Sequence, residues 1–222
     1  MRRYAWILLS LLIAQTRPTT DPALWDQMQK INAKTLSVKS LIADFQQQKS
    51  TPMLTQPLIS HGKLTILGGT MLWNTADPEP TQMHIDPEHI EIYYPDQKTL
   101  EIYNIEQKLA SLAASPLPQL SVLAKYFTFE KLSEDLQRDE VTLKLLPIGE
   151  IRQHINEVDV KLNEQTGLVE EMTLVDGDQD RTTISFSHVQ TNLPVKKQEV
   201  EISMPSGVKV THPLAGLESE GP

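Results

Sequence analysis

Residues 62–103 form a series of short segments in which apolar residues occupy every second position. Turn residues separate the segments, as at Gly68-Gly69, Asp86-Pro87 and Pro95-Asp96. This alternation is typical of strands with one apolar and one polar face. Because such short connections join only antiparallel neighbours, the pattern predicts an antiparallel sheet. The same stretch carries few groups that could perform chemistry, which favours a binder or carrier of an apolar ligand.

The N-terminus has the pattern of a secretory signal. A basic start at Met1-Arg2-Arg3 precedes an apolar run over residues 4–14. That run is shorter than the roughly 20 residues that span a bilayer. We therefore expect a signal peptide and leader over residues 1–20, with an uncertain cleavage site, and a soluble mature protein. An N-terminus that is uncleaved, or one that is merely buried, is the alternative. The 222 residues suit a single domain, expected over 21–210, followed by a polar tail over 211–222.

Composition excludes several classes of function. The chain has no cysteine, which rules out disulfides, thiolate metal sites, a cysteine nucleophile and a lipid-modified N-terminal cysteine. The formal net charge of −9 disfavours nucleic acid and anionic lipid headgroups as partners.

Two helices are expected. Residues 22–35 place Leu24, Met28 and Ile31 on one helical stripe, after Asp21 and Pro22 at the start. Residues 119–127 form the second predicted helix, which should pack on the apolar face of the sheet or over its open end.

Strands are expected on both sides of the second helix. Residues 40–50 indicate a strand with Phe45 inward, although a helix is the alternative there. After the helix, strands are expected over residues 141–146, 154–162, 169–175, 181–189 and 199–204, with turns at residues 165–167, 176–178 and 206–207.

No pattern indicates catalysis or a metal. The alternating carboxylates of residues 176–180 suggest a calcium loop, but a hairpin turn is favoured because the glycine is misplaced and Ser187 stands where an EF-hand has glutamate. His84, Asp86 and His89 match no zinc spacing, and strand parity predicts that His84 faces water. There is no Gly-x-Ser-x-Gly and no phosphate-binding glycine loop. A dispersed carboxylate pair stays open, with nothing in its favour.

Several segments, in chain order, resemble the LolA-type family of periplasmic lipoprotein carriers. After the signal and first helix they are Ala43–Lys49, Gly62–Leu64 with the glycine turn to Leu72-Trp73, Pro78, Tyr94-Pro95, the helix over residues 117–127, Thr183–Phe186, Asn192 and Pro205–Val210. The similarity covers about residues 22–210. The order and spacing of the segments carry the resemblance.

The resemblance implies a mainly β (α+β) fold: an incomplete antiparallel β-barrel or curved sheet with an N-terminal helix and a helical lid over an apolar cavity. Family members bind acyl chains of lipoproteins released at the inner membrane and deliver them to an outer-membrane receptor. We therefore expect a monomeric periplasmic carrier without catalysis, cofactor or metal. Its partners would be lipidated proteins, an inner-membrane releasing transporter and the outer-membrane receptor.

Strand parity and the resemblance together predict the cavity lining. The strand residues are Leu64, Ile66, Met71, Trp73, Met83, Ile85, Ile92, Tyr94 and Phe186, and the lid residues are Leu120, Leu123 and Phe127. A filled core is the alternative, because periodicity cannot distinguish it from a cavity.

One departure from the family concerns lid control. The best-known carriers have an arginine, thought to latch the lid, after the strand that matches residues 63–67, whereas this chain has Gly68-Gly69. Alternative functions are a lipoprotein-sensing regulator or a glycolipid or phospholipid carrier on the same fold, an exported hydrolase, and a structural sandwich.

Overall fold

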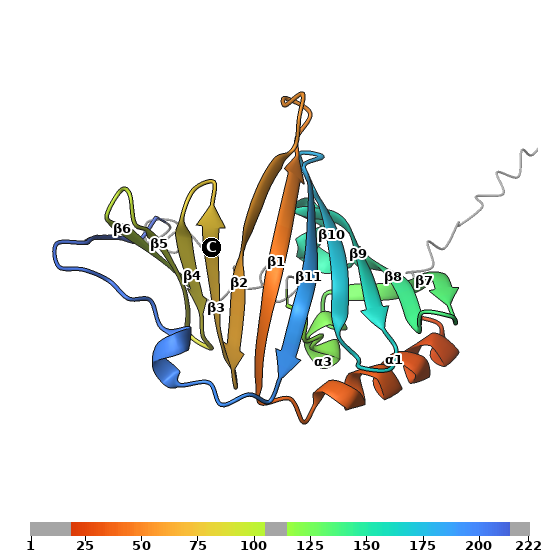
Figure 1. The fold of residues 1–222 in the computed structure, drawn as a ribbon. Coiled ribbons are helices and arrows are strands. Elements are labelled where there is room, and N and C mark those ends of the chain that lie inside the picture. Colours follow the sequence, from red (N-terminus) through yellow and green to blue (C-terminus); the bar gives the residue numbers. More distant parts are fainter. Residues whose placement is uncertain (1–18, 105–114, 214–222) are drawn as a thin grey trace, which may run out of the picture.

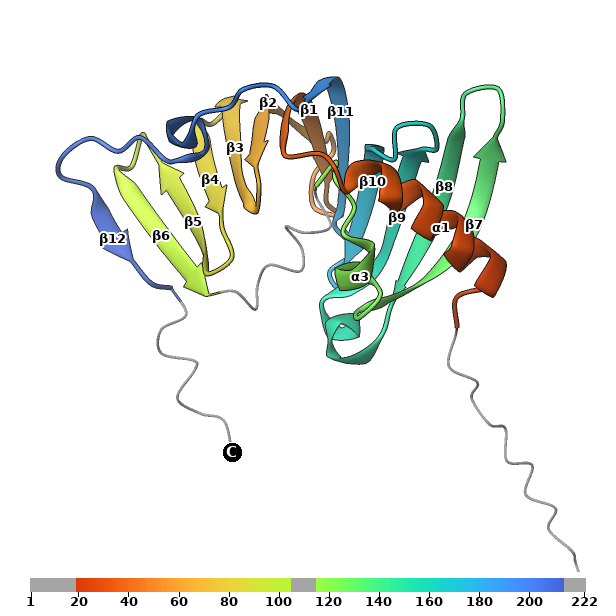
Figure 2. The same cartoon turned by 90° about the horizontal axis from the view of Figure 1, so that it is seen from below.

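The computed structural model describes residues 19–104 and 115–213, which form one strongly curved, open sheet (Figures 1 and 2). Its 12 strands follow the order β12-β6-β5-β4-β3-β2-β1-β11-β10-β9-β8-β7. All neighbouring strands are antiparallel except β12 and β6, which are parallel. The strands are β1 Ser40–Ser50, β2 Leu58–Leu67, β3 Thr70–Asp77, β4 Thr81–Ile85, β5 His89–Tyr94, β6 Thr99–Asn104, β7 Phe127–Asp135, β8 Glu140–Pro147, β9 Ile155–Asn163, β10 Val169–Asp176, β11 Arg181–Thr191 and β12 Lys209–Thr211. The predicted curved antiparallel sheet is confirmed.

Helix α1 (Pro22–Thr35) packs on the concave side of the β7–β10 half of the sheet (Figure 2). Its first turn is capped by the Asp21 carboxylate, which accepts hydrogen bonds from the N–H groups of Ala23 and Leu24. Leu24, Met28 and Ile31 recur at helical spacing and are buried. The predicted helix is therefore confirmed, and its apolar stripe faces the sheet.

Strand β1 joins the two halves of the sheet, because it pairs with β2 on one side and β11 on the other. The predicted strand over residues 40–50, with Phe45 inward, is confirmed. The ring of Phe45 packs against Trp73, with a centroid distance of 4.5 Å, and Trp73 lies 6.0 Å from the ring of Phe186. Gly62, opposite Phe45 in β2, leaves space for this ring.

The predicted helix over residues 119–127 is wrong in extent. Helix α3 covers only Leu120–Leu123, and Phe127 begins β7. Pairing with β8 buries both Phe127 and Phe129, which are 2% exposed, and aromatic residues fit a half-buried sheet well. The lid expected from this segment is thus reduced to a single turn, and a helical lid over a cavity is not confirmed.

The predicted strand over residues 199–204 is also wrong. A short 3-10 helix, η3 (Lys197–Val200), stands there and contacts β2 and β3, with Val200 buried. Figure 2 shows this helix on the convex side of the sheet, so the segment covers a face instead of extending the ladder. A second 3-10 helix, η2 (Gly149–Gln153), connects β8 and β9.

The expected terminal segments are mostly outside the described residues. The signal peptide over residues 1–20 falls almost entirely there, as does most of the tail over 211–222, so both stay predictions. Thr211 belongs to β12, which lies beside β6.

Gly62 provides a test of the packing at β1. A Cβ added to Gly62 would lie 2.6 Å from the Phe45 ring and would also overlap the backbone carbonyl of Asn74. We expect Gly62→Ala to lower the free energy of unfolding by about 2 kcal/mol, because neither the ring nor the strand can move freely. Urea unfolding measures the effect.

Gly69→Ala is the matched control, since the nearest atom to its added Cβ would be 3.7 Å away. It should change stability by no more than about 0.5 kcal/mol. Equal losses in the two variants would contradict the assigned packing.

Candidate ligand-binding site

The strand residues predicted to line a cavity share the concave face of the sheet. One row of directly paired residues runs through Leu64, Trp73, Met83 and Ile92, and a second runs through Ile66, Met71, Ile85 and Ile90. Phe186 is paired with Phe45, and Tyr94 has the same strand parity as Ile92. The strand periodicity therefore placed these residues on one side of the sheet, although their contact with a ligand stays a prediction.

Burial divides this face into a packed part and an accessible part. Toward β1 the residues form a dense core: Leu64, Ile66, Met71, Trp73, Ile85 and Phe186 are all less than 10% exposed. The indole N–H of Trp73 donates to the Met71 sulfur at 3.0 Å, so its polar atom is paired. On β4 and β5, Met83, Ile92 and Tyr94 are half-buried. These three are the predicted residues that a ligand can reach without displacing the core.

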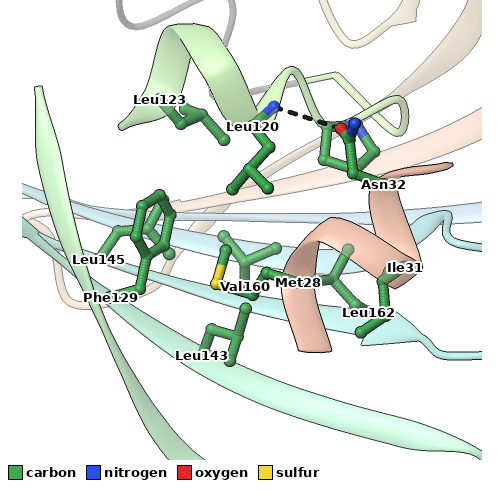
Figure 3. A pocket seen from close by; sticks show the side chains of 11 residues that line it. Met28, Ile31, Asn32, Leu120, Leu123, Phe129, Leu143, Leu145, Val160 and Leu162 are labelled. Atoms are coloured by element: carbon green, nitrogen blue, oxygen red, sulfur yellow. Dashed lines mark hydrogen bonds between the residues drawn. The ribbon is translucent and has the colours of Figure 1, made fainter. Parts of the chain in front are cut away.

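A small cavity lies on the other half of the sheet, beneath α1 and α3 (Figure 3). Its volume is about 30 Å³, which holds one or two water molecules but no acyl chain. The lining consists of Met28, Ile31, Asn32, Pro118, Leu120, Leu123, Phe129, Leu143, Leu145, Val160 and Leu162. Only Leu120 and Leu123 were predicted as site residues. The sequence analysis missed the strand residues, although Val141, Leu143 and Leu145 show the alternation that marks an apolar face.

A polar contact holds α3 against α1 at this cavity. The side-chain oxygen of Asn32 accepts a hydrogen bond from the N–H of Leu120 at 3.3 Å (Figure 3). Asn32 is the one polar side chain of the lining. Leu120 and Leu123 are buried against the sheet, whereas the predicted lid residue Phe127 belongs to β7.

The apolar row ends in a polar cluster at β6. Glu101 is paired with Ile92, and one of its carboxylate oxygens accepts hydrogen bonds from Tyr103 at 2.6 Å and Tyr94 at 3.2 Å. Burial and the contact with Glu101 raise the pKa of Tyr103 to about 12. Burial, with the nearby Glu101 charge, also raises the pKa of Tyr94. Both phenols are therefore neutral donors at physiological pH.

The candidate metal patterns have other roles. The Asp176 carboxylate accepts hydrogen bonds from the N–H groups of Asp178 and Asp180, both at 3.0 Å, and Asp180 pairs with Lys49. This arrangement is a hairpin turn, as predicted. Within residues 19–104 and 115–213, no group of three or more His, Asp or Glu side chains is placed to hold a metal ion.

The prediction that His84 faces water is wrong. Its side chain is 12% exposed and its Nδ1 lies 3.2 Å from Glu91. Strand parity places it opposite Met83, as expected, but on a convex face where η3 and its flanking chain cover part of the sheet.

The sequence of the sheet matches a known protein family. A family model described as "Outer membrane lipoprotein carrier protein LolA" matches residues 36–202, most of the described sheet. The chain belongs to the LolA family. The family's description is that of a carrier protein, not of an enzyme. No protein with a curated description matches the sequence.

Solved structures share the LolA-like fold at low sequence identity. An uncharacterized conserved protein from Thermus thermophilus has a TM-score of 0.56 and 8% identity, covering 86% of this chain and 99% of that one. A DUF1329 family protein from Desulfovibrio piger has a TM-score of 0.51 and 11% identity, covering 83% and 98%. MucB has a TM-score of 0.51 and 13% identity, covering 84% of this chain and 65% of its own. At such identities the likeness shows the fold alone.

Among the described residues of this family member, no helix combines the length and apolar character that crossing a bilayer requires.

The Glu101 cluster gives a pH-dependent prediction. The unfolded chain releases the Tyr103 proton near the ordinary pKa of 10, whereas the folded chain keeps it until about 12. The unfolded state therefore binds fewer protons in this window, and stability should fall as pH rises from about 10 to about 12. An ultraviolet absorbance titration of the folded protein should show that Tyr94 and Tyr103 both ionise later than an ordinary tyrosine, and Tyr103→Phe should remove the component near 12. A component near 12 that keeps its full amplitude in this variant would contradict the assignment.

Proposed function

We propose that this LolA-family chain is a periplasmic carrier that binds acyl chains of lipoproteins on the concave face of its sheet. The observation that supports this most directly is the row from Leu64 through Trp73 and Met83 to Ile92, which is apolar across four adjacent strands. The family's description as a lipoprotein carrier agrees with such a ligand.

The chemistry of the face suits binding by contact area. An acyl chain offers no hydrogen bonds, and each buried CH₂ contributes about 0.8 kcal/mol. Met83 and Ile92 are half-buried and pack against the core, so a chain lying on them adds contacts without opening the sheet. Trp73 and Phe186 would form the floor of this site.

Release requires a closed state and an open state. The cavity of about 30 Å³ cannot hold cargo, so the apolar surface beneath α1 and α3 is closed in this structure. Helix α3 is a single turn, and one hydrogen bond from Leu120 to Asn32 joins it to α1. Few interactions would therefore be broken if α3 moved away from the sheet. In this proposal Leu120 and Leu123 exchange contacts with the sheet for contacts with the acyl chain, and docking partners would shift that equilibrium.

The family's description as a lipoprotein carrier also supports a proposal for the wider role. We propose that residues 1–20 direct export, and that the monomer receives lipoproteins from an inner-membrane releasing transporter and delivers them to an outer-membrane receptor. No catalytic group, cofactor or metal is required for this cycle. Carriage of a phospholipid or glycolipid, or lipoprotein sensing, would use the same face with different cargo or partners.

A charge on the concave face tests the site. Met83→Glu should weaken binding of a diacylated or triacylated peptide at least about tenfold, because a carboxylate on this face would lose hydration against the acyl chain. Native mass spectrometry of the protein with the peptide measures the bound fraction.

Asn74→Glu is the matched control. Asn74 lies on the neighbouring strand β3, is exposed, and has strand parity opposite to Trp73, so the variant adds the same charge to the convex face. Binding should be unchanged in it. If the two variants bind equally well while both remain folded, the concave face is not the acyl site.

A further inference from the structure

The hairpin tip between β1 and β2 is an unusual apolar surface. Residues 52–59 are all exposed, and they include Met53 at 91%, Leu54 at 45%, Leu58 at 56% and Ile59 at 44%. Figure 1 shows that this tip extends beyond every other described turn at its end of the sheet. Large apolar side chains gathered at a projecting tip indicate an interaction site, whereas scattered ones need no explanation.

The tip carries no charge. From Ser50 to Gly62 there is no Lys, Arg, Asp or Glu, although 22% of the chain is charged. Another exposed hairpin shows the contrast: Leu136 is 78% exposed but stands among Glu134, Asp135 and Arg138. The uncharged tip can therefore leave water without breaking an ion pair or burying a charge.

The conformation of the tip is defined by the chain itself. Pro52 and Pro57 restrict the backbone at both ends of the loop. The side-chain oxygen of Thr51 accepts a hydrogen bond from the N–H of Met53, and its carbonyl accepts one from Leu54. The paired strands continue to Lys49 and Leu58, so the apolar side chains stand on a supported hairpin.

We propose that this tip, residues 51–59, inserts into the interfacial region of a lipid bilayer with uncharged or zwitterionic headgroups. The neighbouring turn supports this choice of partner. Arg181 and Lys49 lie beside Asp176, Asp178 and Asp180 at the same end of the sheet, so the base of the tip has no excess of positive charge. Anionic headgroups would gain nothing there, whereas an uncharged apolar tip gains from burial alone.

Membrane contact goes beyond carriage of cargo. Contact through the tip does not depend on which lipid or lipoprotein the concave face accepts, because the tip is a different surface. Through the tip the chain would contact a bilayer while its concave face stays accessible to an acyl chain.

Site-specific labelling tests the proposal, because the chain has no cysteine and a single introduced one is unique. Met53→Cys in the full chain is labelled with an environment-sensitive fluorophore and mixed with phosphatidylcholine vesicles. We expect a blue shift and a several-fold rise in emission, with quenching by a lipid-attached quencher. Leu136→Cys, labelled in the same way, is the control and should show neither change. Vesicle binding through any other part of the chain would affect the two labelled proteins equally, so only contact through the tip changes the Met53 label alone.

A second substitution keeps the test decisive. Leu54→Glu in the labelled protein should lower the apparent vesicle affinity about tenfold, because a charge would enter the interface. The proposal is overturned by an unchanged Met53 label, by equal changes at both labels, or by a change that requires anionic lipid. It is equally overturned by a change that grows with protein concentration without vesicles, which would indicate a second copy.

Binding of acylated peptide by Met53→Glu separates this inference from the proposed carrier function. That variant should bind the peptide normally while losing vesicle contact. If the parent protein does not bind the peptide, the carrier function is contradicted. The fluorescence of the two labelled proteins still tests the membrane contact independently.

Discussion

The packing of Phe45 over Gly62 is the contact on which the two halves of the molecule depend. Strand β1 is the only described strand that pairs with both β2 and β11, so the backbone pairing between the halves of the sheet passes through it. Phe45 fills the concave side of this strand and contacts Trp73, which in turn reaches Phe186 across the junction. Because a side chain at residue 62 would occupy the same space, the missing Cβ of Gly62 allows the Phe45 ring to lie directly against β2.

The two halves of the concave face have different surroundings. Over β7–β10, α1 and α3 bury most of the apolar side chains and leave the small cavity between the two helices and the sheet. Over β4 and β5, Met83 and Ile92 keep part of their surface accessible, and the row ends at the Glu101–Tyr103 pair. A ligand on this face would therefore meet an apolar floor, a closed end under the helices and a hydrogen-bonding end at β6.

Much of this fold could be predicted from the sequence, for identifiable reasons. The helix over residues 22–35 has both a cap and a stripe, and strand parity identified one face from Leu64 to Tyr94 because every intervening turn is short.

The length of the helix over residues 119–127 was overestimated because Leu120, Leu123 and Phe127 have helical spacing. The pairing of Phe127 with Pro147 of β8 is a long-range contact that local periodicity does not report. Similarly, the apolar residues near 200 suggested a strand but cover the convex side of β2 and β3. The cavity under α1 could not be predicted, because its size depends on how side chains from five separate segments fill space.

The open sheet has two free edges, and each differs from an ordinary strand. At one end β12 contributes only Lys209–Thr211 and runs parallel to β6, so little of its backbone is available for a further strand. At the other end β7 changes register between Lys131 and Ser133 and carries Glu130, Lys131 and Glu134. Short, irregular and charged edges resist pairing with a second chain. An open sheet can polymerise through its ends, and the form of these two edges disfavours that pairing.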